Sequence, residues 1–252
     1  MSLDDAARHW LVARPIAHRG LHAKSRGVVE NSLAAAAAAI GRTYAIECDV
    51  QLTKDGEAVV IHDETLDRLT SARAQVRDLT AAEITQIPYR DGDGRIPLLA
   101  DFLSAVAARV PLIVEVKSRF DGDMRLAARV TALIADYPGP LGLQSFDPAV
   151  LIHFRTSATG RPLGLVAQAD YVEAEWPGLS HETRQSLTTF GDYARVRPDF
   201  LAWNLADLPH AVAMLWRSGM GLPLLTWTVR DATQAELAAR FADQMIFEGF
   251  VP

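Results

Sequence analysis

Short apolar segments typical of β-strands alternate with helix-like segments along almost the whole chain. A continuous apolar run indicates a strand buried on both faces, as in a parallel sheet that helices cover on each side. Asn31 is the predicted N-cap of the helix over 34–40, between the first two strands. Apart from the apolar run 58–62, which follows a tight turn, the sequence predicts eight strands. They are residues 15–18, 44–50, 112–116, 141–146, 162–168, 200–204, 224–229 and 244–247.

Eight strands with mostly helical crossovers favour closure into a (β/α)8 TIM barrel, an α/β fold that commonly has about 250 residues. The chain has 252 residues, so we expect a single barrel domain over 1–252. The apolar run 58–62 follows the turn 54–56, which predicts a small hairpin after the second strand, within an insertion at about 55–97. A doubly wound open sheet is the alternative, but no Gly-x-Gly-x-x-Gly phosphate loop follows the first strand.

The composition limits the binding partners and the cellular compartment that we expect for this chain. The formal net charge of −6 argues against a nucleic-acid-binding surface. The single cysteine, Cys48, excludes an internal disulfide and suits a reducing compartment. Residues 1–5 lack the features of a secretory signal, and no run approaches the roughly 18 apolar residues of a membrane span. We therefore expect a cytoplasmic protein without stable membrane insertion. A signal peptide removed before this sequence begins is the open alternative, and nothing indicates the oligomeric state.

The N-terminal segment has an apolar stripe of its own. Leu3, Ala7, Trp10 and Leu11 share one face of a predicted helix. Such a stripe suits either a plug at the bottom of the barrel or a membrane-surface contact. We favour the plug.

Charged side chains stand at the ends of several predicted strands. A strand repeats every two residues, so Glu47 and Asp49 point to one face, as do Glu115 and Lys117. Active residues of a barrel gather at the C-terminal ends of its strands, so we expect these groups to converge, together with His18. Buried carboxylates are unfavourable unless a positive charge holds them. The pattern therefore indicates a metal-assisted catalytic site, with a structural ion-pair network as the alternative.

Further candidates complete this site. The run 58–61 ends in His62 as the first strand ends in His18, and two such histidines suit general acid–base catalysis. Three carboxylates and no second cysteine indicate a hard divalent cation, Mg²⁺ or Ca²⁺. Phe146 and Trp227, near the ends of two later strands, are candidate substrate walls, with core packing as the alternative.

Several motifs in this sequence resemble those of the glycerophosphodiester phosphodiesterase family. The resemblance covers nearly the whole chain and is most specific between residues 18 and 70. The matching motifs are His18-Arg19-Gly20, Glu30-Asn31, Glu47-x-Asp49 with residues 50–56, residues 59–63, Leu66-x-Arg68-x-Thr70, residues 114–117, Gln144-Ser145-Phe146 and residues 226–229.

The resemblance implies a (β/α)8 barrel that uses a divalent cation to hydrolyse small-molecule glycerophosphodiesters to an alcohol and glycerol 3-phosphate. The roles it implies are an acid–base pair (His18, His62), metal ligands (Glu47, Asp49, Glu115) and phosphate contacts (Arg19, Lys117). The glycerol 2-hydroxyl of such a substrate is a built-in nucleophile. Its attack on phosphorus would give a cyclic phosphate, with one histidine as base and the other as acid.

Two positions depart from the usual family pattern. Val29 stands where a proline usually precedes the Glu-Asn pair. Phe247-Glu248-Gly249 stands where the last strand usually ends in Thr-Asp and then Pro. We expect the second departure to affect the closing contact of the barrel and a final helix, and not the chemistry.

Two other functions remain open at this point. A lysophospholipase D or sphingomyelinase D-like phosphodiesterase would need an apolar groove or membrane-docking loops at the barrel mouth, in the insertion 66–96 or the connection 169–198. A non-catalytic binding barrel is the other alternative, and the presence of both histidines and all three acids counts against it.

Overall fold

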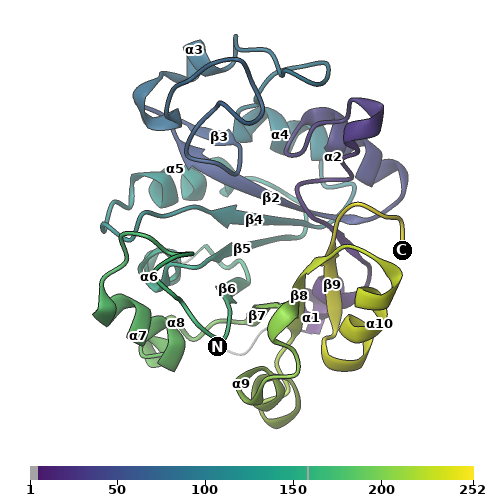
Figure 1. Cartoon of the computed structure of the whole chain (residues 1–252), viewed down its shortest axis with the longest axis vertical. Coiled ribbons are helices and arrows are strands. Elements are labelled where there is room, and N and C mark those ends of the chain that lie inside the picture. The colour runs from purple at the N-terminus through teal and green to yellow at the C-terminus, as the bar shows by residue number, and fades with distance from the viewer. Residues whose placement is uncertain (1–4, 158) are drawn as a thin grey trace.

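The computed structural model describes residues 5–157 and 159–252, and its centre is a closed barrel of parallel strands. Figure 1 shows the strands gathered in the middle with helices around them. The barrel strands are β1 (Ile16–Ala17), β2 (Ala45–Leu52), β4 (Leu112–Val116), β5 (Leu141–Ser145), β6 (Leu163–Ala167), β7 (Phe200–Asn204), β8 (Leu224–Val229) and β9 (Gln244–Phe247). Strand β1 closes the barrel by pairing with β2 on one side and β9 on the other. The predicted TIM barrel is therefore confirmed, and the open-sheet alternative is wrong.

Helices connect most of these strands and cover the barrel from outside. They are α1 (Asp5–Val12), α2 (Leu33–Gly41), α3 (Ala81–Ile84), α4 (Leu99–Val106), α5 (Arg125–Ile134), α6 (Pro148–Thr156), α7 (His181–Thr189), α8 (Tyr193–Val196), α9 (Ala211–Met214) and α10 (Ala232–Phe241). Their apolar faces pack on outward-pointing strand residues such as Ile46, Cys48 and Val50. Cys48 is buried there and faces away from its two acidic neighbours, because strand side chains alternate.

The inward-pointing residues at the N-terminal ends of the strands form a second apolar layer. Ala45, Ile113 and Phe200 lie in it, together with Leu11 of α1. Leu11 is only 1% exposed, so α1 closes this end of the barrel. This is the plug expected for Trp10 and Leu11, while Leu3 lies outside the described residues.

The insertion after β2 is a small structure of its own, shown at the top of Figure 1. Strand β3 (Ala58–Val60) pairs antiparallel with β2 and forms the predicted hairpin. Residues 61–98 then carry α3 and pack around a separate apolar cluster that includes Leu66, Ile84 and Tyr89. The insertion thus brings residues 62–68 over the mouth of the barrel.

One local prediction needs correction, and one connection contains helices that were not predicted. Helix α2 is capped by the Ser32 hydroxyl, which accepts from the Ala35 amide, and not by Asn31. The long connection 169–198 contains α7 and α8, where the apolar pattern was too weak to predict helices. Among the residues described, no helix has both the length and the apolar character needed to cross a membrane.

Candidate active site

Three carboxylates converge inside the C-terminal end of the barrel. Glu47 and Asp49 lie on β2, and Glu115 lies opposite Asp49 on β4 in parallel register. One oxygen of each lies within 4.8 Å of the others, and all three side chains are buried. The parallel register explains the convergence, because it places side chains from the same height of neighbouring strands next to one another.

Two basic side chains face this acidic cluster. The Lys117 ammonium lies 2.8 Å from Asp49 Oδ1 and also donates to Glu115. The Arg19 guanidinium lies 3.3 Å from Asp49 Oδ2 through Nε and donates to Glu30 through Nη1 at 2.7 Å. Burial alone would raise the pKa of Asp49, but Lys117 and the other nearby basic groups lower it overall.

Glu47 has a different electrostatic environment. Burial, followed by the neighbouring carboxylates of Asp49 and Glu115, raises the pKa of Glu47 well above its usual range. Its Oε2 accepts from the backbone amide of Arg19 at 3.0 Å. Its Oε1 is buried and has no hydrogen-bond partner among the described residues, and neither has Oε1 of the neighbouring Gln144. Buried oxygen donors with free lone pairs fit a hard divalent cation, so this cluster fits the expected metal site.

The turn after β1 fixes one wall of the cluster. Arg19 has a left-handed backbone with φ of 57°, which turns its amide toward Glu47. Gly20 follows with φ of 76°, and a Cβ at this position would lie 2.8 Å from Ala35. Only glycine fits this close approach without a backbone shift. The His-Arg-Gly sequence therefore provides the backbone conformation that the turn requires, and it also supplies the polar side chains of His18 and Arg19.

His18 lies beside the acidic cluster and is held by a residue from the far end of the chain. Its Nδ1 lies 2.6 Å from Glu248 Oε2, and its Nε2 lies 4.0 Å from Glu47 Oε2. Glu248 also accepts from Arg230 Nε at 2.8 Å and lies 3.6 Å from His22 Nε2. We expected the Glu248 region not to affect the chemistry, but Glu248 contacts a candidate catalytic histidine directly.

Burial lowers the pKa of His18, while the hydrogen bond to Glu248 opposes that effect. The contact between His18 and Glu248 also changes the pKa of Glu248. Burial alone would raise the pKa of Glu248, but the hydrogen bond from His18 and the nearby His22 ring lower it overall. Glu248 is therefore a carboxylate that fixes the His18 ring with Nε2 directed toward the acids.

His62 stands at the rim of the site, on the segment that follows β3. The Asp63 carboxylate accepts from His62 Nδ1 at 2.7 Å, which leaves Nε2 free for a substrate. Asp63 is also bonded to Arg68, and Arg68 donates to Glu30 at 2.7 Å. This chain of ion pairs ties the insertion to the turn after β1.

Two adjoining cavities open above these residues. The inner one has a volume of about 180 Å³ and contains His18, Arg19 and the three carboxylates. The outer one has a volume of about 590 Å³ and is lined by four Phe and Trp rings and by polar and charged side chains. The residues shared by both are His62, Glu115, Lys117, Phe146 and Trp227.

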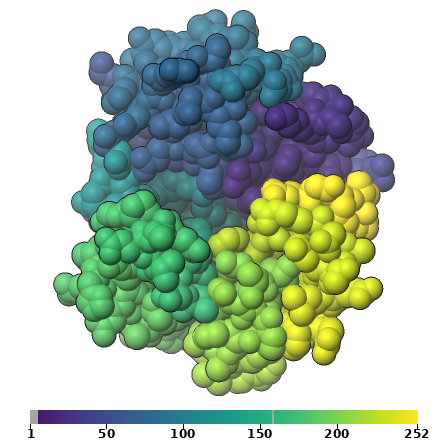
Figure 2. Space-filling model, viewed as in Figure 1, coloured from purple at the N-terminus to yellow at the C-terminus, as the bar shows by residue number. Residues whose placement is uncertain are grey.

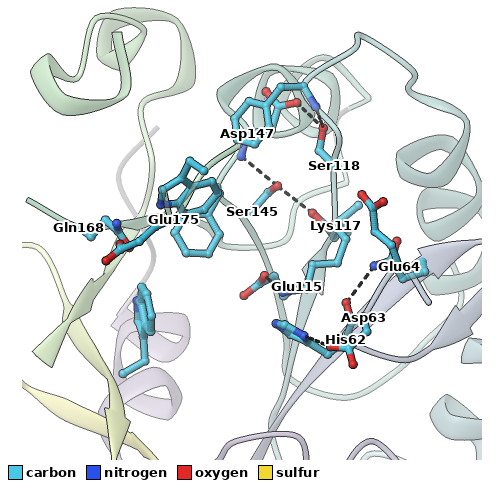
Figure 3. Close-up of a pocket in the computed structure, with 16 residues that line it drawn as sticks. His62, Asp63, Glu64, Glu115, Lys117, Ser118, Ser145, Asp147, Gln168 and Glu175 are labelled. Atoms are coloured by element: carbon cyan, nitrogen blue, oxygen red, sulfur yellow. Dashed lines mark hydrogen bonds and ion pairs between the residues drawn. The ribbon is translucent and has the colours of Figure 1, made fainter. Parts of the chain in front are cut away.

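The walls of the outer cavity come from segments far apart in the chain. In Figure 3, His62, Asp63, Glu115 and Lys117 lie on one side of it, and Gln168 and Glu175 lie on the other. In Figure 2 the blue insertion, the green connection after β6 and the yellow C-terminal segment meet around a hollow. Phe146 and Trp227 line both cavities and are 5.6 Å apart between ring centroids. They line the cavities and also pack against the apolar layer inside the barrel.

Some residues around the site were missed by the sequence analysis. Asn31 donates to Asp49 Oδ2 at 2.8 Å and accepts from the Asp49 amide at 3.2 Å, so it supports a carboxylate and not a helix. Glu248 follows the last barrel strand, and the rule that strand ends carry active groups could have found it. Trp176 lies within the connection 169–198, where no sequence signal marked it.

The comparisons with known proteins show the family and agree with this fold. The Glycerophosphoryl diester phosphodiesterase family matches residues 18–251. The Bacillus subtilis protein YhdW is 27% identical over 242 residues, which cover 92% of each chain. A glycerophosphodiester phosphodiesterase of Caldanaerobacter subterraneus is 40% identical over 126 residues, which cover 49% of this chain and 47% of the relative.

Solved structures give the same result at the level of the fold. An Oleispira antarctica phosphodiesterase in complex with its product sn-glycerol-3-phosphate has a TM-score of 0.77 at 20% identity, covering 94% of this chain and 93% of that one. A Thermotoga maritima glycerophosphodiester phosphodiesterase has a TM-score of 0.69 at 26% identity, covering 92% of each chain. With a family match over residues 18–251, this chain belongs to the glycerophosphoryl diester phosphodiesterase family, whose members are hydrolases.

Proposed function

We propose that this protein hydrolyses glycerophosphodiesters at the C-terminal end of its barrel, releasing an alcohol and glycerol 3-phosphate. The observation that supports this most is the convergence of three buried carboxylates and two histidines on adjoining cavities, in a chain of this family. The product bound to the Oleispira antarctica relative is of the same chemical class.

Glu47, Asp49 and Glu115 would hold a divalent cation, Mg²⁺ or Ca²⁺, since all their donors are hard oxygens. When bound, the cation supplies charge that neutralises phosphate oxygens and favours ionisation of a nearby hydroxyl. Lys117 would add positive charge on the same side, and the planar Arg19 guanidinium suits contact with two phosphate oxygens.

The two histidines differ in position, and this difference suggests their roles. The His18 side chain is 13% exposed and lies in the inner cavity only, whereas His62 is 35% exposed and lies where the two cavities join. If phosphoglycerol binds in the inner cavity, the leaving alcohol extends into the outer one. We therefore assign the base to His18 and the acid that protonates the leaving alcohol to His62.

The reaction would then proceed in two steps. The 2-hydroxyl oxygen of the substrate attacks phosphorus while its proton passes to His18 Nε2, and the bond from phosphorus to the head-group oxygen breaks as His62 protonates that oxygen. The products of this step are a cyclic glycerol phosphate and the free alcohol. Water then opens the ring, with His62 as base and His18 as acid, and yields glycerol 3-phosphate. The tethered hydroxyl acts at high effective molarity, so the first step needs no positioned water.

The test uses the purified protein with glycerophosphoglycerol, followed by phosphorus NMR. We expect hydrolysis with added Mg²⁺ or Ca²⁺, loss of hydrolysis in EDTA, and recovery on adding the cation back. Turnover that persists after complete metal removal would overturn the cation site, and inactivity under all conditions would overturn the function. A 2-deoxy substrate should bind but turn over very slowly, and comparable cleavage of it would show that water is the nucleophile.

A further inference from the structure

We propose that the outer cavity is a subsite for a quaternary ammonium head group, so that the preferred substrates are diesters of choline-like alcohols. This inference rests on the proposed function and specifies its substrate class. It concerns the part of the outer cavity that lies beyond the acidic cluster, where loop residues and Trp227 of β8 form the walls.

Four aromatic rings line this subsite, together with polar and charged side chains. Trp176 lies at its centre, with its ring centroid 4.9 Å from that of Phe146 and 6.4 Å from that of Phe120. Trp227 contacts Phe146 on the other side, and its Nε1 donates to the Ala202 carbonyl at 2.9 Å. That hydrogen bond fixes the orientation of the indole, so the ring is pre-organised as a wall.

The charge around the cavity is predominantly negative. Its lining contains five carboxylates and a single lysine, Lys117, which is already paired with two acids of the metal cluster. Glu175 stands next to Trp176 in the sequence and lines the same cavity. Among the residues described, no basic side chain lies within 4.0 Å of the Glu175 carboxylate, whereas Glu64 on the opposite wall pairs with Arg119 at 3.6 Å. The Glu175 charge is thus available to a ligand.

Aromatic faces combined with a free carboxylate favour one class of head group. A quaternary ammonium is attracted by the electron-rich faces of aromatic rings and needs no hydrogen bonds, which the rings could not supply. An anionic head group would be repelled by Glu175. The subsite therefore selects by charge and shape together.

The experiment compares glycerophosphocholine with its neutral isostere, the glycerophosphodiester of 3,3-dimethylbutanol, which has carbon in place of the quaternary nitrogen. We expect kcat/KM to be about ten-fold higher for the choline diester, the size of effect that cation–π contacts produce. Equal kcat/KM for the two substrates would overturn the proposal while leaving the hydrolase function intact. Inactivity toward these two and toward glycerophosphoglycerol would instead contradict the function.

Variants locate the selectivity within the cavity. Trp176→Ala and Glu175→Gln should each reduce the ratio of kcat/KM for the choline diester to kcat/KM for its neutral isostere about three- to ten-fold. Glu173→Gln is the matched control, because it removes the same charge from the same segment and Glu173 does not line the cavity. If Glu173→Gln lowers the preference as much as Glu175→Gln, the effect is one of general surface charge, which contradicts a specific subsite.

A binding measurement tests the subsite without turnover. Titration with choline should change the tryptophan fluorescence of the wild-type protein in a saturable manner, and Trp176→Ala should weaken this response. The absence of a saturable change, or preferential hydrolysis of lysophosphatidylcholine over glycerophosphocholine with no response to choline, would show that the aromatic walls serve an acyl chain instead.

Discussion

The two ends of the barrel interior are built from the same strands and have opposite chemistry. On β2, Ala45 lies in the apolar layer that α1 closes, and Glu47 lies two residues further on in the acidic cluster. On β4, Ile113 and Glu115 show the same relation. These positions share one face of each strand, because side chains alternate. Positions only two residues apart on one strand therefore belong to different layers. The first layer stabilises the barrel, and the second contains the candidate catalytic groups.

The free-energy contributions of the two layers differ in sign. Burying apolar surface at the lower end stabilises the fold by about 25 cal/mol per Å². At the upper end, buried carboxylates lie close together, and their desolvation and mutual repulsion are unfavourable until a cation or basic side chains neutralise them. The following predictions probe this difference, in order of decreasing effect on activity.

Glu47→Gln should cause the largest loss of activity. Loss of a ligand removes charge stabilisation that a metal ion supplies, and we expect kcat to fall about a thousand-fold or more. The metal-free protein should not be destabilised, because burial with Asp49 and Glu115 nearby already raises the pKa of Glu47 and favours its neutral form. Isothermal titration with Mg²⁺ and Ca²⁺, activity assays, and denaturation in EDTA measure the three effects. A variant that keeps wild-type cation affinity would remove Glu47 from the ligand set.

His18→Ala and His62→Ala should each lower kcat by about 10²- to 10⁴-fold, as expected for a lost general acid or base. Cation affinity should survive in both variants, since neither histidine is assigned as a ligand. His181→Ala, an exposed position at the start of α7, is the control and should retain full activity. Near-wild-type turnover in either active-site variant would exclude that histidine from the mechanism.

Glu248→Gln should have an intermediate effect, because Glu248 acts through His18. We expect kcat to fall about ten-fold while KM and cation affinity stay nearly unchanged, since the ring loses a charge-assisted hydrogen bond but not its place. Glu248→Asp should recover more activity than Glu248→Gln, as it keeps the carboxylate. A parallel rise in KM and loss of cation affinity would instead indicate general disruption of the site.

Ile113→Ala should affect activity least and stability most. Truncation of this buried side chain should lower the free energy of unfolding by about 2–5 kcal/mol. Turnover of the folded protein should remain within about two-fold of wild type, because the change lies below the acidic cluster. Urea denaturation and assays well below the unfolding temperature measure the two quantities. A large fall in kcat with unchanged stability would show that the two layers are not separable in this way.

Much of the fold and the acidic cluster could be predicted from the sequence, because both depend on local periodicity. The bounds of β4, β7, β8 and β9 agree with the predicted strands residue for residue. The two-residue spacing of Glu47 and Asp49 was enough to place both on one face of β2. Once eight such strands pair in parallel, groups at the same height become neighbours, whatever the loops do.

The contacts that only the tertiary structure decided are those between loops. Glu248 and His18 are 230 residues apart and meet because β9 pairs with β1 to close the barrel. Trp176 reaches the cavity from a connection whose path depends on α7, α8 and the strands beneath it. Strand periodicity determines the side to which a side chain points, which is why Phe146 and Trp227 could be named as candidate walls from the sequence. Loops have no such period, so the contribution of Trp176 could be recognised only after the chain had been traced over the barrel mouth.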